Sequence, residues 1–487
     1  MLTMFGSPRK CCDRLTRRET LQAGSLSLLG GLLGGGRAGM ASPVQRPVGN
    51  GKAKSVIVLY LLGGAPTQDM CDLKPLAPDG IRSEFDPIAT NVPGMELSDL
   101  LPKSARWMHK TAIVRSVNHK AGCHNPMPSL TGYPEPLPSI GVVQDHLPPS
   151  IGSVCDYLSH QARPNGGETH TSNAGQLPAY VHMPCMLGWG QHIRRAGPYA
   201  GFLGRQYDPL FTECEPTSDR PSAGVYDPQV VKGVPRLPTA KLPAGISLDR
   251  LNLRRSLTRQ FDDQLRQTEA REEFVRSQDG AMTLLTSPAI RDAFDMEKVS
   301  PKLQEQYGKT LFGSSALVAR KLVQEGVKFV NVTWDIFWTR PGKLDGAGWD
   351  THQKNAPILR NPLLPNFDQT FSGLMQDLSD TGLLDETLVV VMSDMGRTPK
   401  VNKNGGRDHW TFCYSVMLAG AGIQGGTVYG ASDGQAAYVK DNPVSPADIN
   451  ATIYRCLGID PEVTVPDSSG QPVRISMGGR SIDEILV

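Results

Sequence analysis

Three short segments in the last third of the chain carry residue types that bind metals and transfer protons. They are GWDTH (348–352), SDMGR (393–397) and GRDHW (406–410). Together they place three aspartates, two histidines and two arginines within about 60 residues. Carboxylates and imidazoles are typical ligands of divalent cations. These residues therefore predict a metal site and, with it, a metal-dependent hydrolase.

The first and third segments each pair an aspartate with a histidine. Asp350 and His352 are two residues apart, which puts both on one side of an extended segment. The alternative is that Asp350 caps a helix and His352 is a surface residue. In the third segment His409 is a candidate ligand, with Asp408 as a second ligand or as its orienting partner. The alternative is a core histidine.

Further carboxylates follow two predicted strands. Asp394 comes directly after the apolar run 388–392, so its carboxylate needs a partner, either a metal or Arg397. The alternative is a structural Asp394–Arg397 ion pair. Asp69 and Asp72 follow the first predicted strand, where they are candidate ligands or simply turn-forming residues.

The stretch 119–245 is rich in Pro, Gly and His and has little periodicity. It predicts long loops over a sheet, and loops of that length are usually functional lids or walls. His119 and His124 lie at its start, as candidate ligands or proton-transfer groups. The alternative is that both are isolated loop residues.

Five apolar runs predict the strands that position these residues: 55–62, 111–117, 329–333, 388–392 and 415–419. Helical patterns alternate with them at 247–276, 302–325, 367–380 and 446–457, the last opened by Ser445 and Pro446. This alternation predicts a doubly wound, mostly parallel α/β sheet with helices on both faces. Ligands of such sheets sit outside the carboxyl ends of the strands, where the candidate residues fall.

The N-terminus carries a candidate export signal. Arg17 and Arg18 precede a weakly apolar stretch, 26–33, which predicts a twin-arginine signal over 1–41 and a linker over 42–53. An α/β domain would then span 54–487, in a periplasmic or extracellular protein. The apolar stretch is shorter than the roughly 20 residues of a membrane span. The alternative is a disordered basic tail.

Charge and cysteine content exclude some classes of partner. The formal net charge is +2. Without 1–41 the chain loses six basic and two acidic residues, leaving 44 against 46, so no nucleic acid partner is expected. Seven of the nine cysteines remain and none forms a CxxC, which argues against a zinc knuckle. Isolated disulfides are compatible with an oxidising compartment.

Motifs along almost the whole chain resemble one family. They lie at 63–75, 197–209, 307–332, 349–352, 383–399, 406–410 and 418–433. The chain resembles the domain of unknown function 1501 family, which is sulfatase-like and belongs to the alkaline phosphatase superfamily. The resemblance implies an alkaline-phosphatase-like fold with one or two divalent ions, commonly zinc, calcium or magnesium. It also implies hydrolysis of phosphate or sulfate esters.

The resemblance assigns roles to individual positions. Asp350 and His352 correspond to a ligand pair joined by His409. Asp394 stands where the superfamily usually carries Asp-His, but Met395 follows it. Apart from the resemblance, the hydrolase hypothesis has Arg397 hold the anionic group of the substrate in bidentate fashion.

The chain also departs from the sulfatase pattern. Sulfatases place Cys-x-Pro-Ser-Arg before Leu-Thr-Gly, whereas residues 123–132 read CHNPMPSLTG, which argues against formylglycine. Cys123, Ser129, Thr67 or a water on the metal are the candidate nucleophiles. The first strand ends in Gly63 and Gly64 rather than in an aspartate.

The first hypothesis is an exported metallohydrolase acting on a small anionic ester. Its predicted metal residues are Asp350, His352, Asp394, Asp408, His409, Asp69 and Asp72, with Arg397 and His124 as catalytic residues. The alternative is a noncatalytic exported binding or assembly protein on a phosphatase-like scaffold. A sugar-binding protein is a weaker third reading. For the exported readings, the twin-arginine export machinery is a further expected partner.

Overall fold

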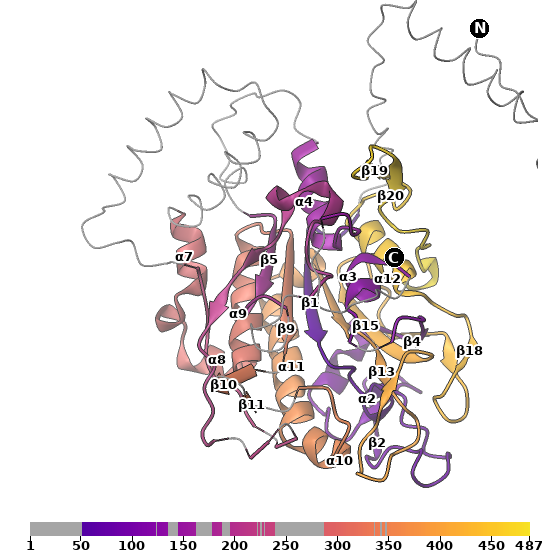
Figure 1. Ribbon diagram of the computed structural model, residues 1–487. Coiled ribbons are helices and arrows are strands. Elements are labelled where there is room, and N and C mark those ends of the chain that lie inside the picture. Colours follow the sequence, from indigo (N-terminus) through magenta and orange to yellow (C-terminus); the bar gives the residue numbers. More distant parts are fainter. Residues whose placement is uncertain are drawn as a thin grey trace, which may run out of the picture. The chain divides into compact units, whose positions relative to one another are not determined.

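The computed structural model contains all 487 residues (Figure 1). It describes residues 51–122, 124–134, 145–161, 178–187, 195–221, 223–224, 226–227, 229–238, 287–335, 337–340, 343–345 and 348–487. The predicted export signal, the helix predicted at 247–276 and Cys123 lie outside the described residues. The described residues all belong to one compact unit, Arg46–Val487.

An eight-stranded sheet forms the centre of this unit (Figure 1). Its order is β16-β4-β15-β12-β1-β9-β5-β6. The strands are β1 (Ser55–Leu61), β4 (Thr111–Val117), β5 (Tyr180–Met183), β6 (Leu210–Phe211), β9 (Phe329–Trp334), β12 (Thr387–Met392), β15 (Tyr414–Gly420) and β16 (Thr427–Tyr429). All five predicted strands are confirmed.

Pairing in the sheet is mostly parallel, as predicted. β1 pairs in parallel with both β12 and β9, and β5 joins β9 and β6 in the same way. β15 alone runs antiparallel, to β12 and β4. The carboxyl ends of β1, β4, β9 and β12 therefore lie at one edge of the sheet, and β15 begins there.

The two faces of the sheet support two hydrophobic cores. In β1, Ile57 and Leu59 enter one core, whereas Val58 and Tyr60 enter the other. This alternation follows from the two-residue period of a strand, and it explains the continuous apolar sequence of β1, which is buried on both sides.

Helices cover both faces, which confirms the doubly wound fold. The first core includes side chains of α9 (Leu311–Gln324) and α11 (Leu364–Asp380). The second includes side chains of α4 (Ile151–Gln161) and α12 (Pro446–Cys456). Other helices are α2 (Gln68–Cys71), α3 (Met127–Thr131), α7 (Pro288–Phe294), α8 (Pro301–Tyr307) and α10 (Asn355–Ile358).

Local signals explain where two of these helices begin and end. The helix predicted at 302–325 is two helices, α8 and α9. Gly308, with φ of 80°, ends α8, and the Thr310 side chain accepts a hydrogen bond from Gly313 N–H to start α9. Ser445 caps α12 in a capping box with Asp448, as its sequence predicts.

Short two-stranded ribbons lie in the segments outside the central sheet. They are β2 (Pro87–Ala89) with β3 (Glu96–Ser98), β7 (Glu213–Cys214) with β8 (Pro235–Arg236), β10 (Phe337–Arg340) with β11 (Lys343–Asp345), β13 (Gly396–Arg397) with β14 (His409–Trp410), β17 (Ala431–Ser432) with β18 (Val439–Asp441), and β19 (Thr464–Pro466) with β20 (Pro472–Arg474). The stretch 119–245 is more ordered than its sequence indicates, since it supplies α3, α4, β5 and β6. Among the described residues, no helix has the length and apolar character needed to cross a bilayer.

Candidate metal site

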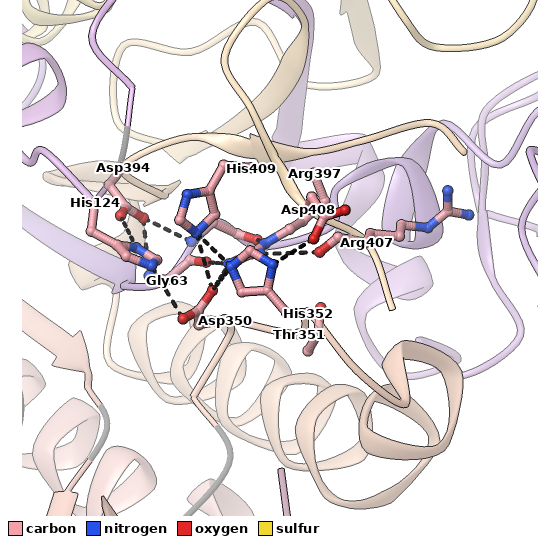
Figure 2. Close-up of polar contacts among 12 residues, drawn as sticks. Gly63, His124, Asp350, Thr351, His352, Asp394, Arg397, Arg407, Asp408 and His409 are labelled. Atoms are coloured by element: carbon pink, nitrogen blue, oxygen red, sulfur yellow. Dashed lines mark hydrogen bonds and ion pairs between the residues drawn. The ribbon is translucent and has the colours of Figure 1, made fainter. Parts of the chain in front are cut away.

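The candidate residues meet at the sheet edge where four parallel strands end. The loop after β1 contributes Gly63 and Gly64, the loop after β4 contributes His124, and Asp394 follows β12 (Figure 2). Asp350 lies on the segment between β9 and α10. Residues far apart in the sequence thus converge because parallel strands end at the same edge.

Asp394 is buried and anchors the loop after β1. Its Oδ1 accepts hydrogen bonds from the backbone N–H groups of Gly63, at 3.0 Å, and Gly64, at 2.8 Å. The Ser393 hydroxyl donates to the same oxygen at 3.0 Å. Gly63 has φ of 120°, and a Cβ there would lie 2.6 Å from the backbone N of Asp350, so the loop requires glycine.

The β13–β14 ribbon brings the second and third segments together. Its register pairs Arg397 with His409, and residues directly opposite on antiparallel strands project on the same face. Both side chains reach Asp350. Arg397 Nη2 lies 2.5 Å from Asp350 Oδ1, and His409 Nε2 lies 3.3 Å from the same oxygen.

Three imidazoles converge on the single carboxylate of Asp350 (Figure 2). His124 Nε2 lies 3.2 Å from Oδ2, and His352 Nε2 lies 3.1 Å from Oδ1. The Nε2 atoms of His352 and His409 are 2.9 Å apart. His124, Asp350 and His409 each offer one ligand atom, and these atoms all lie within 4.8 Å of one another. This donor set suits a divalent cation such as zinc.

Two outer carboxylates orient two of these rings. Asp394 Oδ2 accepts from His124 Nδ1 at 3.0 Å, and Asp408 Oδ1 accepts from His352 Nδ1 at 2.7 Å. Because the carboxylates accept, Nδ1 carries a proton and each Nε2 is turned towards the shared carboxylate. Such carboxylate–histidine pairs fix the ring orientation of metal-binding histidines.

Burial and hydrogen bonding set the charges in the cluster. Burial opposes ionisation of Asp350, but hydrogen bonds from His124, His352 and His409 hold its pKa well below the usual range. Burial likewise opposes ionisation of Asp394, and the hydrogen bond from His124 lowers its pKa to about 2. Both groups are therefore carboxylates at neutral pH.

The imidazoles respond differently to this environment. Burial disfavours protonation of His124, yet hydrogen bonds to Asp350 and Asp394 raise its pKa overall. The hydrogen bond to Asp350 also raises the pKa of His352. Burial lowers the pKa of His409. His124 also has a left-handed backbone, with φ of 34°, which is unusual for a residue with a side chain.

Arg397 is placed differently from its prediction as a substrate-binding residue. Its side chain has no exposed surface. Nε donates to Gly64 O at 2.8 Å, Nη1 to Arg407 O at 3.1 Å, and Nη2 to Gly63 O and Asp350. The guanidinium therefore binds the protein's own carbonyls and carboxylate rather than offering a free fork to an anion.

Asp69 and Asp72 are not brought to the cluster. Asp69 is buried in an ion pair with Arg407, with Nε to Oδ2 at 2.9 Å, and it also accepts from Asn355. Asp72 pairs with Lys74 at 3.0 Å and accepts from the Ser432 hydroxyl. The carboxylates of Asp69 and Asp72, which were predicted as metal ligands, therefore bind Arg407 and Lys74 and neighbouring amide and hydroxyl groups instead.

The other candidates also have structural partners. The Ser129 hydroxyl contacts that of Tyr60 at 2.8 Å, and the Thr67 hydroxyl accepts from Ser415 N–H. His119 is buried, and its Nε2 lies 2.9 Å from the backbone O of Asp394. Met395 is buried, so it offers no replacement for the histidine implied at that position.

Two supporting residues escaped sequence reasoning. Arg195 is buried and donates from Nη1 to the backbone O of His124 at 2.6 Å. Asn402 donates to Asp408 Oδ1 at 3.2 Å and to the backbone O of His352. Neither residue lies in a segment with a metal-ligand pattern, so only the tertiary contacts reveal them.

The molecule is therefore a mostly parallel α/β protein with a candidate metal site of His124, Asp350 and His409 at a strand-end edge. The chain belongs to the DUF1501 family, described as a protein of unknown function, whose model matches residues 53–486. The comparison with curated proteins found no match.

Several solved structures resemble the chain distantly. One is a Vibrio parahaemolyticus member of the alkaline phosphatase superfamily, with 13% identity, coverage of 91% of this chain and 72% of that one, and a TM-score of 0.35. Another is a phosphonate monoester hydrolase from Silicibacter pomeroyi. It has 11% identity, coverage of 88% of this chain and 76% of that one, and a TM-score of 0.37. A Pseudoalteromonas sulfatase has 13% identity, coverage of 97% of this chain and 78% of that one, and a TM-score of 0.34. Likeness at this level carries no argument about activity.

Proposed function

We propose that the protein is an exported, metal-dependent hydrolase of phosphate or sulfate esters. The observation that carries this proposal is the convergence of His124, His352 and His409 on Asp350. Three neutral or cationic rings sharing one carboxylate are hard to explain as packing alone, because buried polar groups usually have their own partners. They are readily explained if His124, Asp350 and His409 are ligands of a cation and His352 is an imidazole beside it.

The residues present fit a divalent metal. His124, Asp350 and His409 would hold it, and Asp394 would orient His124 from behind. A bound divalent cation supplies Lewis-acid stabilisation of negative charge on phosphoryl or sulfuryl oxygens. The low pKa of Asp350 and the lowered pKa of His409 both keep these groups in the forms that bind a cation.

His352 has a different role in this proposal from that of His124 and His409. It lies outside the group of ligand atoms within 4.8 Å, and its side chain is 29% exposed. Asp408 Oδ1 accepts a hydrogen bond from Nδ1 of His352, and Asn402 Nδ2 donates to the same Asp408 oxygen. We assign His352 the transfer of a proton to the leaving-group oxygen, the usual task of an oriented imidazole beside a reacting centre.

Arg397 supports the site rather than the substrate. By binding Gly63 O, Gly64 O and Asp350 together, it holds the loop after β1 against the metal carboxylate. Its positive charge also offsets that of Asp350 inside a buried region, where an unpaired carboxylate would be costly. Preorganisation of this kind places ligands without movement during the reaction.

A noncatalytic binding protein is the second candidate, and one observation favours it. The hydroxyls of Ser129 and Thr67 are engaged in internal contacts. The close spacing of the imidazoles around Asp350 supports metal binding under either candidate, so activity must decide between them.

Export by the twin-arginine route rests on Arg17 and Arg18 and is part of the proposal.

The test separates metal binding from catalysis. The purified protein is analysed for metal by elemental mass spectrometry and assayed on aryl phosphate, phosphonate and sulfate esters. We expect about one equivalent of divalent metal and turnover of at least one ester. His409→Ala should lose the metal and the activity, whereas His352→Ala should keep the metal and lose activity by roughly 100-fold or more.

Asp79→Asn serves as a control, because that carboxylate is exposed and its ion pair is with Arg82, which is not a residue of the cluster. Metal without turnover of any ester would leave the binding protein as the answer. A metal-free wild type of normal fold and unchanged thermal stability in added zinc, calcium or magnesium would overturn both.

A further inference from the structure

Two cysteines meet beyond the carboxyl ends of β5 and β6, and neither belongs to the candidate metal site. Cys185 lies two residues beyond the end of β5, and Cys214 belongs to β7, three residues beyond the end of β6. The parallel pairing of β5 with β6 matches Val181 with Leu210 and His182 with Phe211. Continued beyond the paired residues by number alone, this offset relates Cys185 to Cys214.

Backbone and side-chain contacts support the continuation. Thr212 N–H donates to His182 O at 3.1 Å, which extends the ladder beyond β6. Cys185 and Cys214 then pack together with Leu311 in a small apolar cluster. The side chains of Cys185 and Cys214 also hydrogen-bond to each other, as two thiols placed to form a disulfide would.

The surroundings of the pair limit the reaction of either thiol with small reagents in solvent. Both residues are buried, and hydrogen bonding to Cys214 together with burial raises the pKa of the Cys185 thiol well above its usual range. Cys214 lies between two exposed residues, Glu213 and Glu215, on a strand of only two residues. An oxidant from solvent therefore has a shorter route to Cys214 than to Cys185.

We propose that Cys185 and Cys214 form a structural disulfide that closes the segment between β5 and β7 when the protein enters an oxidising compartment. The oxidant is a second disulfide, either in a thiol–disulfide oxidoreductase or in oxidised glutathione. For its oxidising compartment the proposal rests on the export in the proposed function, but it does not depend on the metal site or on hydrolysis.

The chemistry is two successive thiol–disulfide exchanges. The Cys214 thiolate attacks one sulfur of the oxidant, which releases the other sulfur as a thiolate and leaves a mixed disulfide. The Cys185 thiolate then attacks the Cys214 sulfur and releases the second thiolate. The two cysteines lose two protons and two electrons, and the oxidant's disulfide is reduced to two thiols.

The experiment uses the full chain, oxidised with oxidised glutathione, denatured, alkylated and digested without reduction. Trypsin leaves Cys123, Cys155 and Cys185 in one peptide, because Lys120 is followed by no cleavable site before Arg194. Cleavage after acidic residues as well separates them. We expect a Cys185–Cys214 cross-linked peptide, with a melting temperature roughly 5 °C above that of the reduced protein.

Cys185→Ser and Cys214→Ser should each abolish the cross-link and the dependence of the melting temperature on oxidation. Cys155→Ser, which removes a buried thiol in α4, should preserve both. The peptide map of the wild type decides the matter even where a variant folds poorly. Recovery of both cysteines as alkylated peptides, or linked to other cysteines, overturns the proposal.

Discussion

Asp350 connects every part of the candidate site. Its two oxygens contact His124, His352, His409 and Arg397 at 2.5 to 3.3 Å. The side chain is only 12% exposed, so these contacts replace most of its solvation. His352, His409 and Arg397 all contact the same oxygen, Oδ1, and a cation beside Asp350 would relieve their competition for its lone pairs.

The role of Asp394 gives a prediction at the scale of one atom. Asp394→Asn keeps an oxygen for the Gly63 and Gly64 N–H groups but removes the charged acceptor of His124 Nδ1–H. We expect the affinity for zinc to fall by about 10- to 100-fold with little change in fold, as for other orienting carboxylates. Isothermal titration calorimetry measures it, and an unchanged affinity would show that Asp394 does not act through His124.

Arg397 gives a second prediction at this scale. Arg397→Lys cannot reproduce contacts to Gly63 O, Gly64 O, Arg407 O and Asp350 with one ammonium group. We expect a loss of about 2–4 kcal/mol in the free energy of unfolding, measured by urea denaturation.

Arg82→Lys is the matched control, because Arg82 is 52% exposed and pairs with Asp79 on the surface. That change should cost well under about 1 kcal/mol. If the stability of Arg397→Lys equals that of wild type while ester hydrolysis is lost, Arg397 binds substrate and the structural role is wrong.

At the scale of elements, the pairing of β5 with β9 buries a polar cluster that the metal site does not use. His182 on β5 contacts Asn331 Nδ2 at 3.0 Å and the Thr333 hydroxyl at 3.2 Å, both on β9. Burial lowers the pKa of His182 to about 3. The folded sheet therefore accepts this histidine only as a neutral ring.

This burial predicts how stability varies with pH. Below about pH 6.5 the unfolded chain protonates His182 while the folded chain does not, so its contribution is present above that pH and is lost as pH falls towards 3. Between pH 7 and pH 5 the loss is about 2 kcal/mol. His182→Gln should lose about that much less stability over this interval than wild type.

Urea denaturation at the two pH values measures the difference. His146→Gln, at an exposed position, is the control and should follow the wild type. Equal pH dependence in His182→Gln and wild type would mean that His182 is protonated in the folded state.

At the scale of the whole molecule, the site ties together segments that lie far apart in the sequence. His124 comes from the loop after β4, Asp350 from the segment between β11 and α10, and His409 from the β13–β14 ribbon. A ligand that binds this arrangement and not the unfolded chain stabilises the fold by mass action. The metal should therefore raise the stability of the entire unit and not only of one loop.

We expect zinc or another divalent cation at about 100 times its dissociation constant to add about 2.7 kcal/mol, and excess chelator to remove it. Differential scanning calorimetry with and without chelator measures the shift. A His124→Ala, His409→Ala double variant should lose the response, whereas His146→Ala should retain it. A response that persists in the double variant would place the metal elsewhere.

The sequence by itself determined the layers of this protein and most of its candidate site. The run 388–392 predicted a buried strand and Ser445 predicted a helix start, and the structure confirms both. The strand-end rule then led to Asp350, Asp394 and His409. The strand and helix-start inferences are confirmed because periodicity and capping are local properties of the chain.

The tertiary structure alone decided which residues face one another. Asp69 and Asp394 both follow buried strands, yet Arg407 neutralises Asp69 while His124 reaches Asp394. The sequence indicates that each carboxylate needs a partner, but the identity of the partner depends on contacts across more than 250 positions. Such contacts arise from the packing of loops at one sheet edge, which no local pattern encodes.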